Sequence, residues 1–154
     1  METGPNTRLT GFTLLEILLV VAAISILAGI VIVAINPGEQ LGQTRNAQRR
    51  ADVRTISDAI AQYYLKEGTY PTTFETGTTC GNADEQEICK TGASPCYTDL
   101  SELTTNATYL VSIPVDPLAE STGSGYYVVR NTTTNRVIVC APLAELSETI
   151  SVTR

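Results

Sequence analysis

The sequence predicts an α+β protein in which one long N-terminal helix packs its outer half on a small antiparallel sheet. Three observations predict this fold. Residues 12–35 are almost wholly apolar, residues 39–67 repeat apolar side chains every three or four positions, and short β-branched runs gather near the C-terminus. These patterns are typical of a membrane-spanning helix, an amphipathic helix and strands. We therefore divide the 154 residues into a leader (1–11), an apolar helix (12–35), an amphipathic stem (36–68) and a β domain (69–154).

The apolar helix contains a single carboxylate, that of Glu16, near its start. At about 1.5 Å per residue, residues 12–35 form a helix about 36 Å long, which crosses a hydrocarbon core about 30 Å thick. An ionised Glu in lipid costs about 2.5–3.5 kcal/mol, so we expect Glu16 to have a partner. The helix is therefore expected to be both an anchor and a packing surface.

The start of this helix resembles a known processing signal. A short polar leader ends in Gly11, and Phe12, Thr-Leu-Leu, Glu16 and the apolar helix follow it. Residues 11–35 are similar to the class III signal of bacterial type IV pilins and type II secretion pseudopilins. The resemblance implies that a prepilin peptidase cleaves between Gly11 and Phe12 and that the new Phe12 amine is N-methylated.

The same resemblance implies how the chain assembles. Subunits leave the cytoplasmic membrane for a homo-oligomeric helical filament, a pilus or a pseudopilus, built by an ATPase-driven machinery. The β domain is extracytoplasmic, and Glu16 offsets the Phe12 amine of a neighbouring subunit. Two opposite charges that are desolvated together cost much less than one alone, which agrees with that role.

Other readings of the N-terminus explain fewer of these residues. A secretory signal peptide has a shorter apolar core followed by a small-residue cleavage site. A plain signal anchor explains the length of the helix but neither Glu16 nor the Gly11–Phe12 junction. The alternative function that remains open is a membrane-anchored binding module, such as an adhesin or a DNA receptor. The sequence does not distinguish a pilus from a pseudopilus, or a major from a minor subunit.

The stem is expected to be an amphipathic helix. Pro37 and Gly38 follow the apolar helix, and we expect a kink or break near Pro37, with Gly29 as the other candidate. Val53, Ile56, Ile60 and the tyrosines at 63 and 64 form one apolar stripe, which we expect to dock on the sheet. Gly68 is placed to cap the end of this helix.

Four arginines, Arg45, Arg49, Arg50 and Arg54, lie on the stem. We interpret them as a solvated or headgroup-facing collar beyond the membrane, with a nucleic-acid-binding patch as the alternative. From Glu67 onward the chain has eleven acidic and four basic residues, which argues against general nucleic-acid binding. The leader offers only Arg8, so the charge distribution departs from the positive-inside tendency.

The β domain is expected to contain a loop, a helical turn and several strands. The segment that ends near Asp116 is similar to the C-terminal sheet region of major pseudopilins, in the pattern Tyr109-Leu110…Ile113-Pro114…Asp116-Pro117. Many of those proteins also have a calcium-binding loop rich in Asp, and this sequence lacks such a loop after Asp116. We therefore expect no metal site. The expected elements are an irregular loop (72–98), a helical turn (99–103), a strand (109–113), a turn (121–125) and a hairpin (126–130 with 136–140). Residues 149–153 either add an edge strand or stay irregular.

The four cysteines, Cys80, Cys89, Cys96 and Cys140, all follow the apolar helix and lack the short CxxC spacing of zinc sites. We expect disulfides formed in an oxidising compartment. Four cysteines allow three pairings. We favour Cys80–Cys89 with Cys96–Cys140, because the second bond would fasten the loop to the hairpin.

No catalytic arrangement is visible in the sequence. The chain has no His, which excludes Ser-His-Asp and Cys-His sites, and we expect neither an enzyme nor a cofactor. Asp84, Glu85 and Glu87 are interpreted as a solvated acidic tip, because three adjacent carboxylates offer too few converging oxygens for a cation. The glycan-acceptor patterns at Asn106 and Asn131 are interpreted as surface turns.

Overall fold

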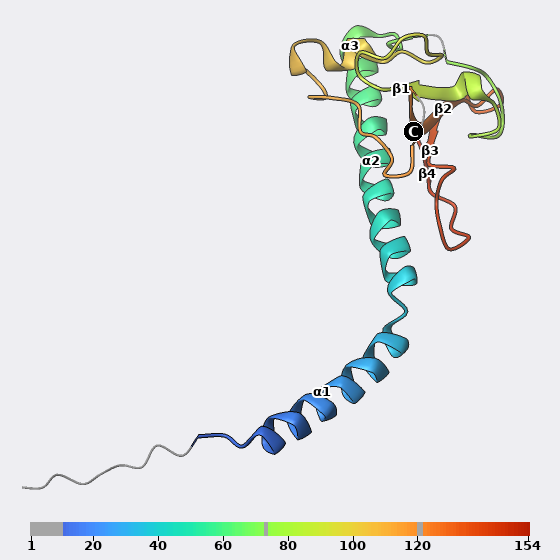
Figure 1. Ribbon diagram of the computed structural model, residues 1–154. Helices are drawn as coiled ribbons and strands as arrows, with labels where there is room; N and C mark the ends of the chain where they lie inside the picture. Colours follow the sequence, from blue (N-terminus) through green and yellow to red (C-terminus); the bar gives the residue numbers. More distant parts are fainter. Residues whose placement is uncertain (1–10, 73, 120–121) are drawn as a thin grey trace, which may run out of the picture. The chain divides into compact units, whose positions relative to one another are not determined.

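The computed structural model describes residues 11–72, 74–119 and 122–154 (Figure 1). The chain consists of two compact units, residues 1–40 and residues 41–154. The predicted leader, apart from Gly11, lies outside the described residues.

The first unit contains α1 (Leu14–Ile35) and the start of α2 (Pro37–Glu67). Thr13 caps α1, since its hydroxyl oxygen accepts a hydrogen bond of 3.2 Å from the Glu16 N–H. The helix runs through Gly29 without interruption and ends at Asn36, whose backbone is left-handed (φ 48°). A residue before proline is disfavoured in the α region, and proline suits the first position of a helix. The break predicted near Pro37 is confirmed.

The remainder of α2 belongs to the second unit and has the predicted apolar stripe. Val53, Ile56 and Ile60 are at most 2% exposed, and Tyr63 packs against the core, whereas Tyr64, which was predicted to belong to the stripe, is exposed. The helix ends where Gly68 adopts a positive φ of 75° and donates its N–H to the Tyr64 carbonyl at 2.9 Å. A side chain would strain this backbone, so the glycine cap is used as predicted.

The sheet is antiparallel, with the order β1-β2-β3-β4. Its strands are β1 (Glu87–Cys89), β2 (Gly123–Arg130), β3 (Val137–Cys140) and β4 (Ser151–Thr153). β2 and β3 form the predicted hairpin, in which Arg130 lies opposite Val137 and Tyr127 opposite Cys140. β4 pairs with β3, so of the two alternatives for residues 149–153 the edge strand is the one observed. The chain therefore has the predicted α+β fold, although β2 begins earlier than predicted and β1 was expected to be loop.

The core lies between α2 and one face of the sheet (Figure 1). Alternation along β2 determines which side chains reach it. Tyr126 and Val128 point into this core, whereas Val129 is buried on the opposite face beneath Gly77. Apolar residues of the connecting segments complete the core: Phe74, Leu100, Leu103, Leu110 and Ile113.

Residues 109–113, which follow α3 (Ser101–Thr104), form turns and irregular backbone, so the strand predicted there is wrong. Leu110 and Ile113 are buried in the core, but their backbone is not paired with a strand of the sheet. The Leu110 N–H donates to Leu103 O at 3.0 Å, and the Ile113 N–H donates to a threonine hydroxyl, that of Thr91, at 2.9 Å. The remaining short elements are the 3-10 turns η1 (Asp84–Gln86) and η2 (Thr105–Ala107).

All four cysteines form disulfides, but the favoured pairing was wrong. The bonds are Cys80–Cys140 and Cys89–Cys96. The unpredicted strand β1 explains the difference. The segment that follows β1 folds back beside it, and the Cys89 N–H donates to Thr98 O at 2.9 Å. This arrangement places Cys96 next to Cys89. Cys80 lies against the hairpin, 3.5 Å from the Tyr127 carbonyl, and therefore meets Cys140.

Candidate functional site

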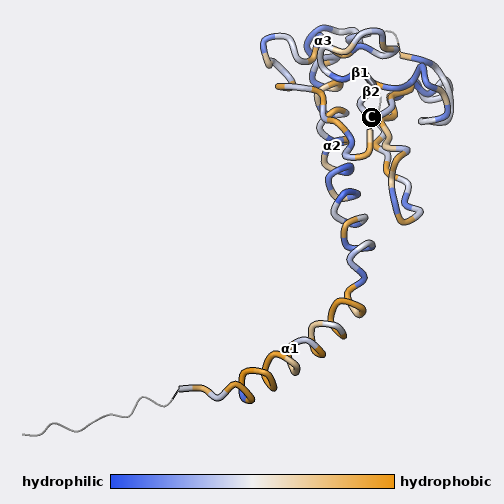
Figure 2. The backbone as a smooth tube through the Cα atoms, in the orientation of Figure 1, coloured by the Kyte–Doolittle hydropathy of each residue, from blue (hydrophilic) through white to orange (hydrophobic). Residues whose placement is uncertain are grey.

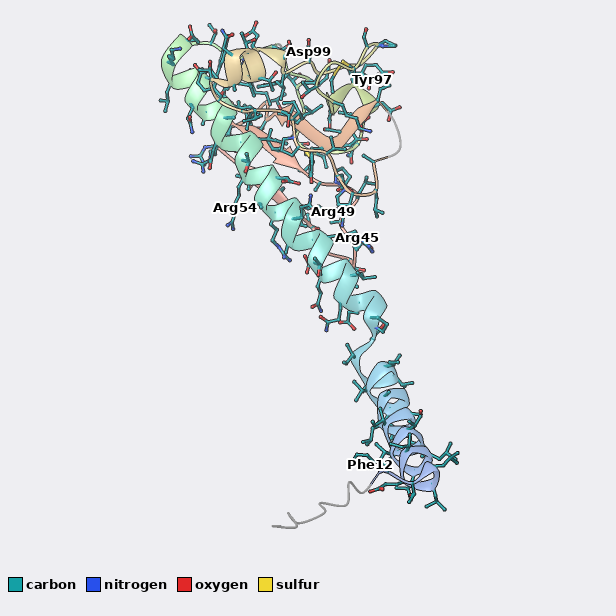
Figure 3. The ribbon with its side chains drawn as sticks, turned by 60° about the vertical axis from the view of Figure 1, so that its left-hand side comes forward. Phe12, Arg45, Arg49, Arg54, Tyr97 and Asp99 are labelled. Atoms are coloured by element: carbon teal, nitrogen blue, oxygen red, sulfur yellow. A yellow bond between two sulfur atoms is a disulfide. The ribbon has the colours of Figure 1, made fainter. Side chains whose placement is uncertain are left out.

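The residues of the predicted processing signal lie at the exposed start of α1. Gly11 and Phe12 precede the helix and have no regular structure, and Phe12 is 80% exposed (Figure 3). The Gly11–Phe12 peptide bond is thus in accessible, non-helical backbone. A peptidase needs this arrangement, because a helical bond would first have to unwind.

Glu16 occupies the third position of α1, after the capping residue Thr13. A carboxylate in the first turn is favourable near the positive end of the helix dipole. Glu16 is exposed, and no ion pair joins it to another residue in the part of the chain that the structure describes. Its negative charge is therefore available to a partner outside the chain.

α1 is exposed along its whole length, and apart from Glu16 and Ser25 its residues are apolar or small (Figure 2). None of its 22 residues is buried. Among the described residues it is the one helix long and apolar enough to cross a membrane. A continuous apolar surface of this size is not stable in water and indicates contact with lipid or with other protein. The structure thus provides a candidate membrane anchor, in agreement with the sequence.

The arginines of α2 do not form the solvated collar that was expected. Arg49 is fully buried and forms a bidentate pair with Asp116, from Nε to Oδ2 at 2.6 Å and from Nη2 to Oδ1 at 3.0 Å. Figure 3 shows Arg49 and Arg45 on the side of α2 that faces the loops of the domain, with Arg54 on another side. A buried charge requires such a partner, because an unpaired one in the interior is very unfavourable.

Glu145 connects the other members of this network. It accepts two hydrogen bonds of 2.6 Å from Arg45 and one of 3.0 Å from Arg49. The Asn46 side chain donates to the Glu145 carbonyl at 2.7 Å and accepts from its N–H at 2.9 Å. The hydrogen bonds from Arg45 and then Arg49 lower the pKa of Glu145 from 4.5 to about 2. Glu145 therefore stays ionised at any physiological pH.

The two remaining arginines differ from each other. Arg50 is ion-paired with Glu148, whereas Arg54 is exposed and makes no ion pair with a residue that the structure describes. Three of the four arginines thus bind carboxylates of the same chain. This pairing reduces the free positive charge that follows the apolar helix.

A signal for the buried arginine was present in the sequence. Six of the buried positions of α2 recur at steps of four and three: Gly42, Asn46, Arg49, Val53, Ile56 and Ile60. Two of these six, Asn46 and Arg49, are polar. The prediction followed apolar residues only and so stopped at Val53. Extending the same spacing towards the N-terminus identifies Arg49 as an inward-facing residue.

The acidic tip is exposed only in part. Asp84 and Glu85 are exposed as predicted, but Glu87 packs on β2 and accepts a hydrogen bond of 3.0 Å from the Gly125 N–H. A Cβ at Gly123 would lie 1.9 Å from the Glu87 carboxyl carbon, so only glycine admits this contact. Within the described residues no three His, Cys, Asp or Glu side chains are grouped to hold a metal ion.

The two glycan-acceptor patterns lie in turns. Asn131 accepts hydrogen bonds of 2.9 Å from the Thr133 and Thr134 N–H groups, and Asn106 has a positive φ of 53°.

No family model, curated protein or solved structure matches the chain.

Proposed function

We propose that this chain is the precursor of a structural subunit of a type IV pilus or a related secretion pseudopilus. It is cleaved after Gly11, N-methylated at Phe12 and polymerised through its N-terminal helix. The observation that carries the proposal is α1, a fully exposed apolar helix with one carboxylate, that of Glu16, in its first turn. A simple anchor needs the apolar surface but not the charge.

The proposed mechanism follows from the cost of burying charge. In the precursor, α1 holds the chain in the cytoplasmic membrane. Cleavage by a prepilin peptidase creates the Phe12 amine four residues before Glu16. In the filament, apolar helices of many copies cover one another and the Phe12 amine of one subunit meets Glu16 of another. Two charges buried as a pair cost far less than either alone, so assembly in register is favoured.

The second unit supports an extracytoplasmic location for the remainder of the chain. Both disulfides lie in it, and disulfides persist in oxidising compartments. The membrane-anchored binding module stays the alternative function. A nucleic-acid receptor is the less supported form of this alternative, because three arginines of the stem bind carboxylates of the same chain. The pairs are Arg45–Glu145, Arg49–Asp116 and Arg50–Glu148.

The Glu16→Ala variant of the full-length chain, expressed in its native host, tests the proposal. Membrane insertion and cleavage after Gly11 should be unchanged, whereas the yield of sheared filaments should fall about tenfold or more, since a buried amine would lose its partner. Ser25→Ala is the matched control, because the Ser25 hydroxyl bonds the Val21 carbonyl of its own helix at 2.8 Å. A normal filament yield from Glu16→Ala would contradict the proposed charge pairing.

A further inference from the structure

An open pocket of about 680 Å³ lies at the start of β2. The residues that line it include the buried Gly123 and Gly125, the half-buried Tyr127 and the exposed Asp84 and Tyr97. Among the described residues that line it, none is a Lys or an Arg. The volume is sufficient for a turn or a large side chain of another molecule.

The pocket combines negative charge with exposed aromatic surface. Asp84 is exposed, and its side chain makes no hydrogen bond or ion pair with a described residue. Tyr97 is 64% exposed. The pKa of Tyr127 is raised by burial and by the nearby carboxylates of Glu87 and Asp84. Carboxylates beside aromatic rings bind cations, and the planar guanidinium of arginine suits both kinds of group.

The opposite end of the same strand is positively charged. Arg130 ends β2 and Arg136 precedes β3, so the two arginines flank the turn 131–135. Both are exposed, and neither side chain forms a hydrogen bond or an ion pair with a residue that the structure describes. The turn is held by hydrogen bonds from Asn131 N–H to Arg136 O at 2.8 Å and from Asn135 N–H to Asn131 O at 2.9 Å.

We propose that the turn between β2 and β3 of one copy docks into this pocket of a second copy, with its two arginines facing the carboxylates of Asp84 and Glu87. The inference rests on the proposed function, because the partner is another subunit of the same filament. Along β2, at about 3.3 Å per residue, Arg130 is about 23 Å from Gly123 and about 10 Å from Tyr127, so the turn lies beyond the pocket and forms a separate surface of the domain.

This placement determines the kind of assembly. A contact between two different surfaces of the same molecule is heterologous, and it generates rings or open helical arrays rather than an isolated pair. The acidic character of the domain opposes close packing of copies, and contacts between opposite charges offset that repulsion. The docking therefore adds a second contact between subunits, separate from that between the apolar helices.

A charge exchange in the full-length chain tests the docking. Arg130→Glu and Asp84→Arg should each lower filament yield about tenfold, because each places like charges in contact. The double variant should return the yield to within about twofold of the unchanged chain, since the pair is restored in reverse. Both residues are exposed, so the fold should persist, which a non-reducing peptide map of the two disulfides checks.

Arg54→Glu is the matched control. Arg54 is also an exposed arginine without an ion pair to a described residue, but it lies on α2 rather than at the turn. Its variant should give normal yield. A yield from Arg130→Glu equal to that of the control, or a double variant no better than the single ones, would overturn the docking.

A direct cross-link gives a second readout. In filaments of Arg130→Lys, a zero-length carbodiimide reagent should join Lys at position 130 to Asp84 or Glu87 of another copy, producing a dimer. Filaments without that cross-link would overturn the docking while leaving the proposed function intact. If the unchanged chain is neither processed at Phe12 nor filamentous, the proposed function itself fails, and the docking with it.

Discussion

Arg49 and Asp116 form a bidentate ion pair in which both side chains are excluded from solvent, although 67 residues separate them. The pair joins α2 to the loop that enters β2. Asp116 also fixes that loop, because its carboxylate accepts from the Leu118 N–H at 2.8 Å and its own N–H donates to Ser124 O at 2.8 Å. The position of the stem on the β domain thus depends on charge as well as on apolar packing.

Removing one partner of this pair should destabilise the domain strongly. Arg49→Ala leaves the Asp116 carboxylate buried without a cation, and such a loss costs about 3–5 kcal/mol in the free energy of unfolding. Denaturant unfolding of the full-length chain in detergent measures this difference. Arg54→Ala, at an exposed site on the same helix, should change stability by less than about 0.5 kcal/mol. Equal effects of the two substitutions would show that the buried pair contributes nothing specific.

The pKa of Glu145 predicts how stability depends on pH. Hydrogen bonds from Arg45 and Arg49 lower this pKa from 4.5 to about 2 in the folded chain. The stabilisation is therefore complete above pH 4.5 and is lost as the pH falls towards about 2. Melting temperatures measured across this range should fall more steeply for the unchanged chain than for Glu145→Gln. Parallel curves would contradict a role for Glu145 in acid stability.

The two disulfides should contribute unequally to stability. Cys80–Cys140 joins residues 60 apart, whereas Cys89–Cys96 joins residues 7 apart. In the chain-entropy description, closing the longer loop stabilises by about 4 kcal/mol and closing the shorter one by about 2 kcal/mol. Unfolding of the Cys80→Ser/Cys140→Ser and Cys89→Ser/Cys96→Ser variants measures both values. A larger loss from the second variant would be opposite to this prediction.

Local patterns predicted the elements whose side chains alternate or repeat clearly. The β-branched residues of the hairpin, the stripe from Val53 to Ile60 and the glycine cap at Gly68 all have the predicted structure. Each depends on interactions close in the sequence or on one buried face. The helix break also followed from local chemistry, since Asn36 precedes a proline.

Features that depend on distant residues were not predicted. β1 has only three residues, two of them Glu87 and Cys89, and its pairing with β2 cannot be inferred from its own composition. Missing this strand led to the wrong disulfide pairing. Arg49 was assigned to the surface because a charged residue is rarely buried, and its partner, Asp116, lies far along the chain.

The central claim, that this chain is a processed filament subunit, is tested most directly by its N-terminal residue. Intact mass and peptide sequencing of the protein from its native membrane should show a chain that begins at Phe12 and is ~14 Da heavier than one with an unmodified amine, as expected for one methyl group. A chain that still begins at Met1 would contradict the claim and would favour a plain membrane anchor for an extracytoplasmic binding domain.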